Sequence, residues 1–172
     1  KIRLGWDSSY KNYLEVTKAI EENGGKMIAI HARTRQQGMR GKVDLDAIAE
    51  IKQNSRIPII GNGDIFSVQD IDQMKSTTGC DAVMIGRGTI GNPWILSHRE
   101  IREVPHHEVL SVISRHLEMM VQIYGEFRGV IRFRKHLKRY LQQTLDLSIQ
   151  EIRLFMNLKQ KDEIILLLNK YY

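Results

Sequence analysis

The sequence predicts an α/β protein in which a parallel sheet is followed by a purely helical segment. In the first hundred residues, short apolar runs alternate with amphipathic helical stretches. The apolar runs are nearly continuous in Ile, Val and Met, as is typical of parallel strands covered on both faces. After Trp94 no strand pattern recurs, and Pro105 marks the start of helical periodicity alone. We therefore expect one domain at residues 1–104 and a second at residues 105–172.

The first part reads as four strands that alternate with three helices. Strands are expected at residues 1–7, 26–34, 56–64 and 81–88, and helices at residues 10–23, 43–53 and 67–79. Asp44 and Ser67 are well placed as N-caps, while Gly24 and Gly79 follow the last residues of two helices. Four further helices are expected in the second part, at residues 106–125, 129–145, 148–160 and 162–172.

Four parallel strands could form an open doubly wound sheet or one half of an eight-stranded barrel. Each predicted strand ends in glycine or polar residues at its carboxyl end, the face where a (β/α)8 barrel carries its active site. Turn formation alone would explain one such strand, but four in succession favour a site. We interpret the chain as the C-terminal half of a TIM (β/α)8 barrel, strands 5–8, followed by a small all-α helical bundle.

Two of these strand ends predict a site for phosphate. GNGD at residues 61–64 and GRG at residues 86–88 offer backbone N–H groups that no Cβ obstructs, and Arg87 adds a guanidinium fork. Amides freed by glycine beside an arginine suit an anion. His31 and Lys1 are expected to reach the same mouth from neighbouring strands.

Bulk composition restricts the class of protein. The chain has 172 residues, of which 42% are hydrophobic and 27% charged, as in ordinary globular proteins. No apolar run approaches the ~20 residues that cross a bilayer, so we expect no membrane association.

A single cysteine, Cys80, fits a reducing cytoplasmic setting and is expected to pack in the core. His106 and His107 have no convincing partners, so no metal site is expected. The chain begins at Lys1, which suggests that an N-terminal segment is missing.

The net charge of +6 is concentrated in the tail, where residues 99–172 carry 13 basic and 9 acidic residues. No acid interrupts residues 127–145. A helical period places four cations of this segment in one stripe: Arg128, Arg132, Lys135 and Arg139. Apolar residues fall on the opposite side and should enter the core: Val130, Phe133, Leu137 and Tyr140. The stripe predicts contact with an RNA backbone that weakens steeply with salt; the alternative is an ordinary solvated face.

Several motifs together resemble one enzyme family. They are KIRLGWD at residues 1–7, HARTRQQGMRGKVD at 31–44, IPIIGNGDIFSVQD at 57–70, TGCDAVMIGRGTIGNPWIL at 78–96, and RFRKH at 132–136. In this order and spacing they resemble the second half of the tRNA-dihydrouridine synthases, most closely the bacterial B type. The resemblance implies FMN enzymes that take hydride from NADPH and reduce the C5=C6 bond of a uridine in tRNA.

The resemblance also implies roles for individual residues. Lys1 would contact the flavin ring and His31 would lie near the flavin or its phosphate. The ribityl and phosphate path would be lined by Asn62, Gly63, Asp64, Gly86 and Arg87. Arg33 and Arg35 would face the substrate uridine or its phosphate. The tRNA would be contacted by Arg128, Arg132, Arg134, Lys135 and Arg139.

The reaction also needs a proton donor for C5, which in this family is a cysteine from the first half of the barrel. Cys80 is not that residue, because it lies at the opposite end of its strand from Arg87. We therefore expect a fragment that contains much of the phosphate-binding site, lacks the catalytic acid and is inactive alone. Two alternatives stay open: another FMN barrel reductase acting on a small substrate, or an RNA-binding fragment without catalysis. The basic stripe argues against the first.

Overall fold

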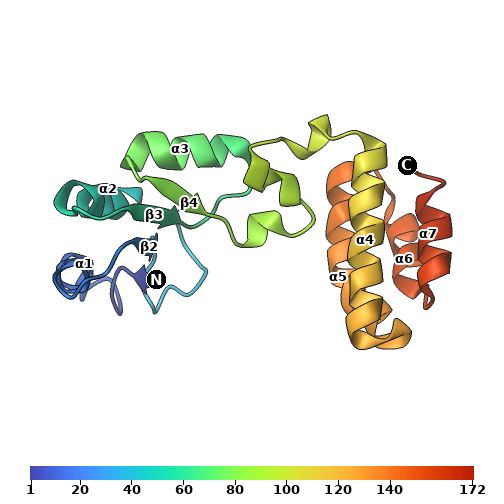
Figure 1. Cartoon of the computed structure of the whole chain (residues 1–172), viewed down its shortest axis with the longest axis horizontal. Coiled ribbons are helices and arrows are strands. Elements are labelled where there is room, and N and C mark those ends of the chain that lie inside the picture. The colour runs from blue at the N-terminus through green and yellow to red at the C-terminus, as the bar shows by residue number, and fades with distance from the viewer. The chain divides into compact units, whose positions relative to one another are not determined.

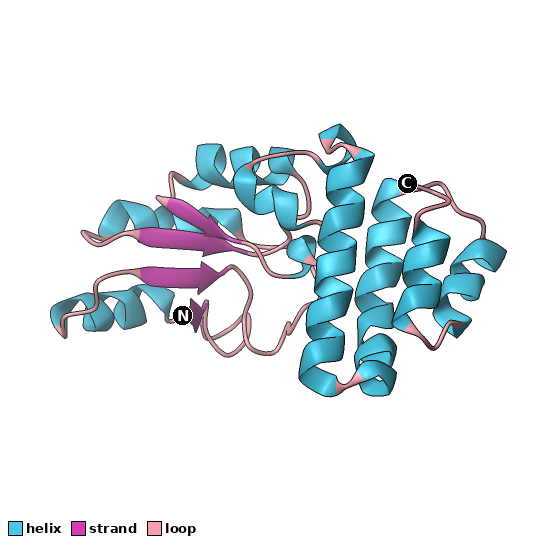
Figure 2. Cartoon of the chain, turned by 45° about the vertical axis from the view of Figure 1, so that its right-hand side comes forward, coloured by secondary structure: helices cyan, strands magenta, loops and turns pink.

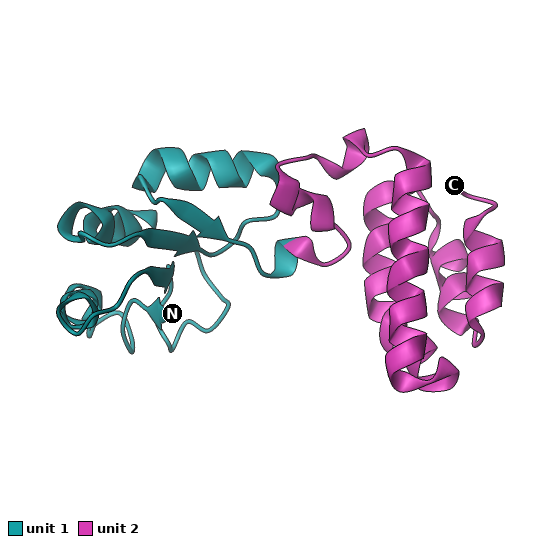
Figure 3. Cartoon of the chain, in the orientation of Figure 1, with its two compact units in different colours: residues 1–88 teal, residues 89–172 magenta.

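The computed structural model describes residues 1–172 and divides them into two compact units, residues 1–88 and residues 89–172 (Figure 3). The first unit contains every strand of the chain. The second unit contains helices only. This is an α/β fold with a parallel sheet and seven α-helices, consistent with part of a TIM-barrel domain.

The sheet of the first unit has four parallel strands in the order β1-β2-β3-β4, with all arrows pointing the same way in Figure 2. Their bounds are β1 (Ile2–Arg3), β2 (Ile28–His31), β3 (Ile59–Asn62) and β4 (Ala82–Met84). The predicted β-α-β-α-β-α-β order is confirmed. Each strand follows its predecessor without a reversal, whereas a doubly wound sheet reverses direction at a switch point. The order therefore agrees with a barrel-type winding.

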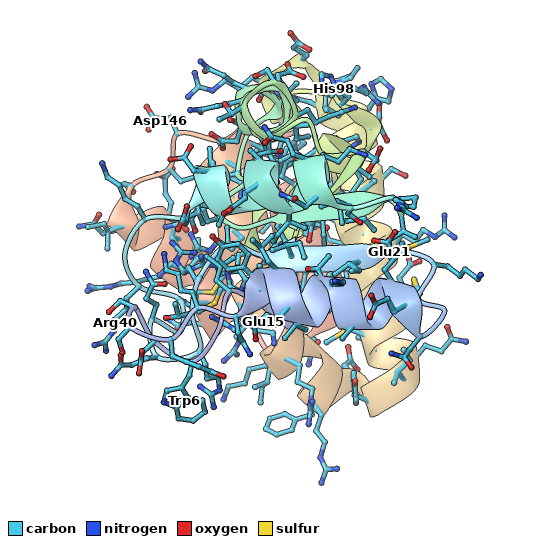
Figure 4. The ribbon with its side chains drawn as sticks, turned by 90° about the vertical axis from the view of Figure 1, so that its left-hand side faces the viewer. Trp6, Glu15, Glu21, Arg40, His98 and Asp146 are labelled. Carbon is cyan, nitrogen blue, oxygen red and sulfur yellow. The ribbon has the colours of Figure 1, made fainter.

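Three helices connect these strands: α1 (Tyr13–Glu22), α2 (Leu45–Asn54) and α3 (Val68–Thr78). Asp44 caps α2 by accepting from Ala47 N at 3.0 Å, and Ser67 forms a capping box with Asp70. Gly79 ends α3 with φ +66°. These caps are the predicted ones. Neighbouring helices contact each other, and Figure 4 shows α1 and α2 side by side in front of the strands.

Strand register determines which side chains lie on the other face of the sheet. A Cβ built on Gly61 would come within 2.9 Å of Met74 Sδ on α3, so this position faces the helices. Successive side chains of a strand point to opposite faces. The next row therefore faces away from the helices, and it runs across all four strands: Arg3, His31, Asn62 and Met84. Polar side chains at the carboxyl ends thus share one open face.

The second unit packs α4 (His106–Tyr124), α5 (Glu126–Thr144), α6 (Ile149–Asn157) and α7 (Lys161–Leu168) around one apolar cluster (Figure 1). All four helices were predicted; α5 begins before residue 129 because Gly125 alone forms the turn after α4. Three short 3-10 turns precede them: η1 (Arg87–Thr89), η2 (Pro93–Ser97) and η3 (Ile101–Glu103). Glu108 joins these turns to α4 by accepting from Trp94 Nε1 at 2.6 Å and from Arg99.

Candidate functional site

A cavity of about 740 Å³ opens at the carboxyl ends of the four strands in the first unit. Charged and polar side chains from the strands and the residues next to them line it: Lys1, Arg3, His31, Arg35, Asn62, Asp64 and Arg87. Its apolar wall contains Met39, Ile65, Phe66, Met84 and Ile85. The two glycine-rich strand ends therefore meet at one cavity, as the sequence predicted, and His31 and Lys1 reach the same mouth.

The Asn62 turn is bonded directly to the end of the neighbouring strand. Asn62 Nδ2 donates to the backbone oxygen of Met84 at 2.6 Å. Gly63 follows with φ +135°, and a Cβ there would lie 2.5 Å from Val43 Cγ1. Only glycine accepts both this backbone conformation and this contact without strain. The turn is therefore fixed in place beside β4.

Asp64 lies between two arginines at the rim of the cavity. Arg33 approaches with both arms, one of them 3.0 Å from Asp64 Oδ1, and Arg87 Nη2 is 3.2 Å from the same oxygen. The Arg33 hydrogen bonds are the main cause that holds the pKa of Asp64 below its usual value, and the charge of Arg87 adds to the effect. Asp64 itself has φ +49°, in the left-handed region. Its ion pairs with Arg33 and Arg87 fix the position of the carboxylate.

Arg33, predicted to face the substrate uridine or its phosphate, is buried in the structure. The residue is only 2% exposed, and its Nε donates to the backbone oxygens of Arg40 and Gly41, each at 3.1 Å. A buried guanidinium needs a counter-charge and satisfied donors, and here Asp64 and the loop carbonyls supply both. In the structure Arg33 thus links Asp64 to the loop carbonyls beneath the rim of the cavity.

Arg35, two residues later, is exposed and lines the cavity. Its loop is held by Arg3, whose Nη1 donates to the backbone oxygens of Thr34 and Gly38, both at 2.8 Å. Sequence reasoning missed Arg3 as a site residue. The signal that could have found it is register, because Arg3 pairs with His31 and so faces the same way.

Arg87 is the half-exposed cation of the rim. Its side chain is 49% exposed, and its guanidinium carbon lies 5.4 Å from the centre of the Phe66 ring. The glycines on either side differ: a Cβ on Gly88 would meet Ile65 O at 2.2 Å, whereas one on Gly86 would meet nothing within 4 Å. Gly88 therefore serves the fold, and Gly86 leaves open space above the strand end.

His31 is neutral at neutral pH because burial, followed by the charges of Arg3, Arg33 and Lys1, lowers its pKa to about 4. A neutral imidazole has one N–H donor and one acceptor nitrogen. Lys1 is exposed immediately before β1, and its Nζ lies 3.1 Å from Met84 Sδ. The cavity thus combines positive charge at its rim with an uncharged hydrogen-bonding group on its floor.

In the second unit, the predicted stripe of α5 is exposed and the predicted apolar side is buried. Arg128, Arg132, Lys135 and Arg139 are exposed, whereas Val130, Phe133 and Leu137 have no exposed surface. Arg134 is not part of this stripe. Its Nη2 donates to the backbone oxygen of Leu158 at 2.8 Å, and its Nε is buried. The structure thus separates Arg134 from the other cations predicted to contact tRNA.

Cys80 is 4% exposed, and its Sγ lies near Gly61 on the helix-covered face of the sheet. No group of three or more His, Cys, Asp or Glu side chains in residues 1–172 could hold a metal ion. None of the helices combines the length and apolar character that crossing a membrane would take.

Residues 1–168 match the model of the dihydrouridine synthase (Dus) family. The chain belongs to this family. It is 37% identical over 156 residues to tRNA-dihydrouridine synthase B of Shewanella oneidensis, covering 83% of the chain and 47% of that protein. The corresponding protein of Pasteurella multocida is 39% identical over 150 residues, covering 83% of the chain and 45% of that protein. A probable tRNA-dihydrouridine synthase of Mycobacterium leprae is 37% identical over 150 residues, covering 82% and 39%.

The chain therefore spans less than half the length of these three dihydrouridine synthases. Among solved structures, a mandelate oxidase matches 97% of the chain at 13% identity with a TM-score of 0.38, a likeness too weak to bear on fold or function. Family membership thus rests on the sequence relatives and the family match.

Proposed function

We propose that this chain is the C-terminal part of a tRNA-dihydrouridine synthase that reduces uridine in tRNA to 5,6-dihydrouridine with FMN and NADPH. The observation that carries the proposal is the meeting of the Asn62 and Arg87 strand ends at one cavity, joined by the Asp64–Arg87 ion pair. In architectural terms, residues 1–104 are half of a TIM barrel that binds FMN. Residues 105–172 are the helical domain that binds tRNA.

The residues of the cavity fit the chemical groups of FMN. Its phosphate needs a cation and close backbone approach, which Arg87 and the open position at Gly86 offer. Its ribityl hydroxyls need side-chain amide and carboxylate partners, which Asn62 and Asp64 supply beside Gly63. The flavin, when bound, supplies the hydride transfer between NADPH and substrate.

The chain's own residues would orient the flavin and the uridine and polarise them by charge and hydrogen bonding. Lys1 places a cation where negative charge on a reduced flavin ring would be stabilised. His31, held neutral by burial, offers one hydrogen bond without adding charge. Arg35 reaches the cavity from an exposed loop and would contact the uridine or its phosphate. Arg33 would act indirectly, because its bond to Asp64 fixes the carboxylate that positions Arg87.

The proton donor of the reaction is expected outside this chain. Cys80 is buried on the helix side of the sheet, away from the row that faces the cavity. The chain alone would then be inactive, and activity would require an N-terminal portion, for which the greater length of the relatives leaves room. Joining the chain to that portion of the Shewanella protein is therefore the direct test.

The chimera should purify with bound FMN, oxidise NADPH and form dihydrouridine in tRNA lacking this modification. Arg87→Ala in the chimera should weaken FMN binding by about 2 kcal/mol, or roughly 30-fold, the scale of a charge-assisted contact. Arg56→Ala is the matched control, since Arg56 is exposed just before β3, at the opposite end of that strand. Equal FMN affinity in both variants would contradict the phosphate assignment.

A second candidate is an RNA-binding protein without catalysis, which the exposed α5 stripe favours. It predicts a chimera that binds tRNA but holds no flavin. An FMN reductase for a small substrate would instead hold flavin and reduce a free pyrimidine or enone while ignoring tRNA. The same preparation therefore separates all three functions.

A further inference from the structure

A second cavity, of about 330 Å³, lies between α4 and α5 close to the turn at Gly125. Its volume falls at the lower end of the range for small-molecule sites, ~300–1,000 Å³. Its lining combines an aromatic ring, aliphatic groups, an imidazole and two cations: Tyr124, Met120, Ile131, His136, Arg132 and Lys135. Both cations also belong to the α5 stripe, so the cavity adjoins the surface proposed to meet the RNA backbone.

The Tyr124 ring is open to planar groups. The residue is 42% exposed, and the guanidinium carbon of Arg132 lies 4.6 Å from the ring centre. A guanidinium is planar and delocalised, so this ring face already carries a group of the same form as a nucleobase. Nucleobases stack on aromatic rings and on arginine planes alike. Arg132 and Tyr124 together therefore present a stacking platform.

The floor and rim of the cavity supply the remaining recognition groups. His136 is half-buried, and burial followed by the charge of Lys135 lowers its pKa. Its neutral imidazole can donate one hydrogen bond and accept another at a base edge. Lys135 stands beside it with charge suited to a phosphate, and Arg132 adds positive charge from the face of the Tyr124 ring. No acidic residue occurs between residues 127 and 145 to compete for these cations.

Apolar side chains continue around the turn, where the fold does not bury them. Ile123 is 65% exposed and Phe127 is 66% exposed, although α4 and α5 have a fully formed core between them. An exposed aromatic residue next to a cationic stripe is a common arrangement for unpaired nucleic acid. Double-stranded RNA presents phosphates and 2′-hydroxyls outward and keeps its base faces stacked inside. The stripe suits either form, but the cavity suits only a base that has left the stack.

From this combination we propose that the Tyr124 cavity binds one unpaired nucleotide of an RNA, with the base on the platform of Arg132 and Tyr124 beside Ile131 and the phosphate on Lys135. The proposal rests on the proposed function, in which RNA is the partner of this helical unit, and it assigns the second unit a preference for single-stranded segments. It is an RNA subsite distinct from the strand-end cavity.

The test uses one fluorescently labelled RNA strand of about 12 nucleotides, containing only A and C so that it cannot pair with itself. Fluorescence anisotropy compares binding of the whole chain to this strand alone and to the same strand annealed to its complement. Tyr124→Leu keeps an apolar side chain but removes the ring, and Tyr124→Phe restores the ring. Tyr10→Leu, at another exposed tyrosine in the first unit, is the matched control.

Tyr124→Leu should weaken binding of the single strand about tenfold, the scale of one lost base–aromatic stack, and leave duplex binding within about twofold. Tyr124→Phe and Tyr10→Leu should behave like the parent chain. Equal loss for both RNA forms would mean that the ring serves only the fold, and no loss for either would mean that the cavity takes no base; both results overturn the proposal. In either case measurable RNA binding would leave the proposed function standing, whereas a chain that binds neither RNA would overturn both.

Discussion

The two basic regions of this chain treat their cations in opposite ways. At the strand-end cavity, Arg33, Arg3 and Arg87 are each held by a carboxylate or by backbone carbonyls of another segment. On α5, the cations of the stripe are exposed, and none forms an ion pair with a carboxylate. The first arrangement fixes the positions of the arginine side chains. The second leaves the cations free of carboxylate partners and exposed to solvent.

This difference matches the kind of ligand proposed for each region. One small phosphorylated cofactor needs donors held at defined positions before it arrives. A long polyanion instead gains from several exposed cations, because each neutralised phosphate releases condensed counterions. Substitutions that disorder the cavity or remove charge from the stripe test the two regions separately.

The largest expected effect is on stability, from Arg33→Met. Removing this buried guanidinium leaves Asp64 without its main partner and several carbonyls without a donor, which should lower the free energy of unfolding by about 3 kcal/mol. Urea denaturation measures the change. Arg35→Met is the matched control, because Arg35 is exposed and its loss should cost less than about 0.5 kcal/mol. Equal losses would mean that burial does not distinguish these two arginines.

The next effect is on RNA affinity, from the double variant Arg132→Glu with Lys135→Glu. Reversing two charges of the stripe should weaken tRNA binding by about 2–3 kcal/mol at moderate salt. The slope of log affinity against log salt should also fall by about 2. Stability should change little, since both side chains are exposed.

Lys18→Glu with Lys26→Glu makes the same change in net charge at exposed positions of the first unit. If this control weakens tRNA binding equally, net charge rather than the stripe controls affinity.

A third effect is the pH dependence that His31 gives to stability. Its folded pKa of about 4 lies below the unfolded value of 6.5, so the unfolded chain binds the proton first as pH falls. Above about pH 6.5, His31 therefore does not lower the free energy of unfolding. Between about pH 6.5 and about pH 4 it lowers this free energy progressively. Between about pH 7 and about pH 5 the loss should reach up to about 2 kcal/mol.

His31→Gln should remove this part of the decline, which thermal or urea unfolding at several pH values would show. His116 and His136 also have lowered pKa values from burial, so both proteins will still lose some stability in acid. The informative quantity is the difference between the two curves. Curves that stay parallel across this pH range would contradict the buried, neutral state of His31.

Local rules predicted most of the fold. Hydrophobic periodicity, the caps at Asp44 and Ser67, and the glycine stops are properties of neighbouring residues, so the helices and the strand order could be read directly. The strands are shorter than predicted because their polar tips extend beyond the last paired residues. The convergence of the two glycine-rich ends followed from parallel topology alone.

Other features of the two sites depend on contacts between residues far apart in the sequence, which local patterns do not predict. Arg33 and Arg35 have the same chemistry and differ only in burial, which depends on Asp64 and on the carbonyls at residues 40 and 41. Arg134 could have been separated in advance, since it lies about 120° from the stripe on a helical wheel. The cavity beside Tyr124 needed the packing of α4 against α5.

The smallest expected effects compare two glycines at the strand-end cavity. Gly63→Ala meets both a positive φ and Val43, so it should lower the free energy of unfolding by about 1 kcal/mol or somewhat more. Gly86→Ala meets open space and should change stability by less than about 0.5 kcal/mol. In the chimera, however, the Gly86 methyl group would occupy space that the proposed phosphate needs, and FMN affinity should fall. An unchanged FMN affinity in Gly86→Ala would show that the phosphate does not approach the backbone there, even with Arg87 in place.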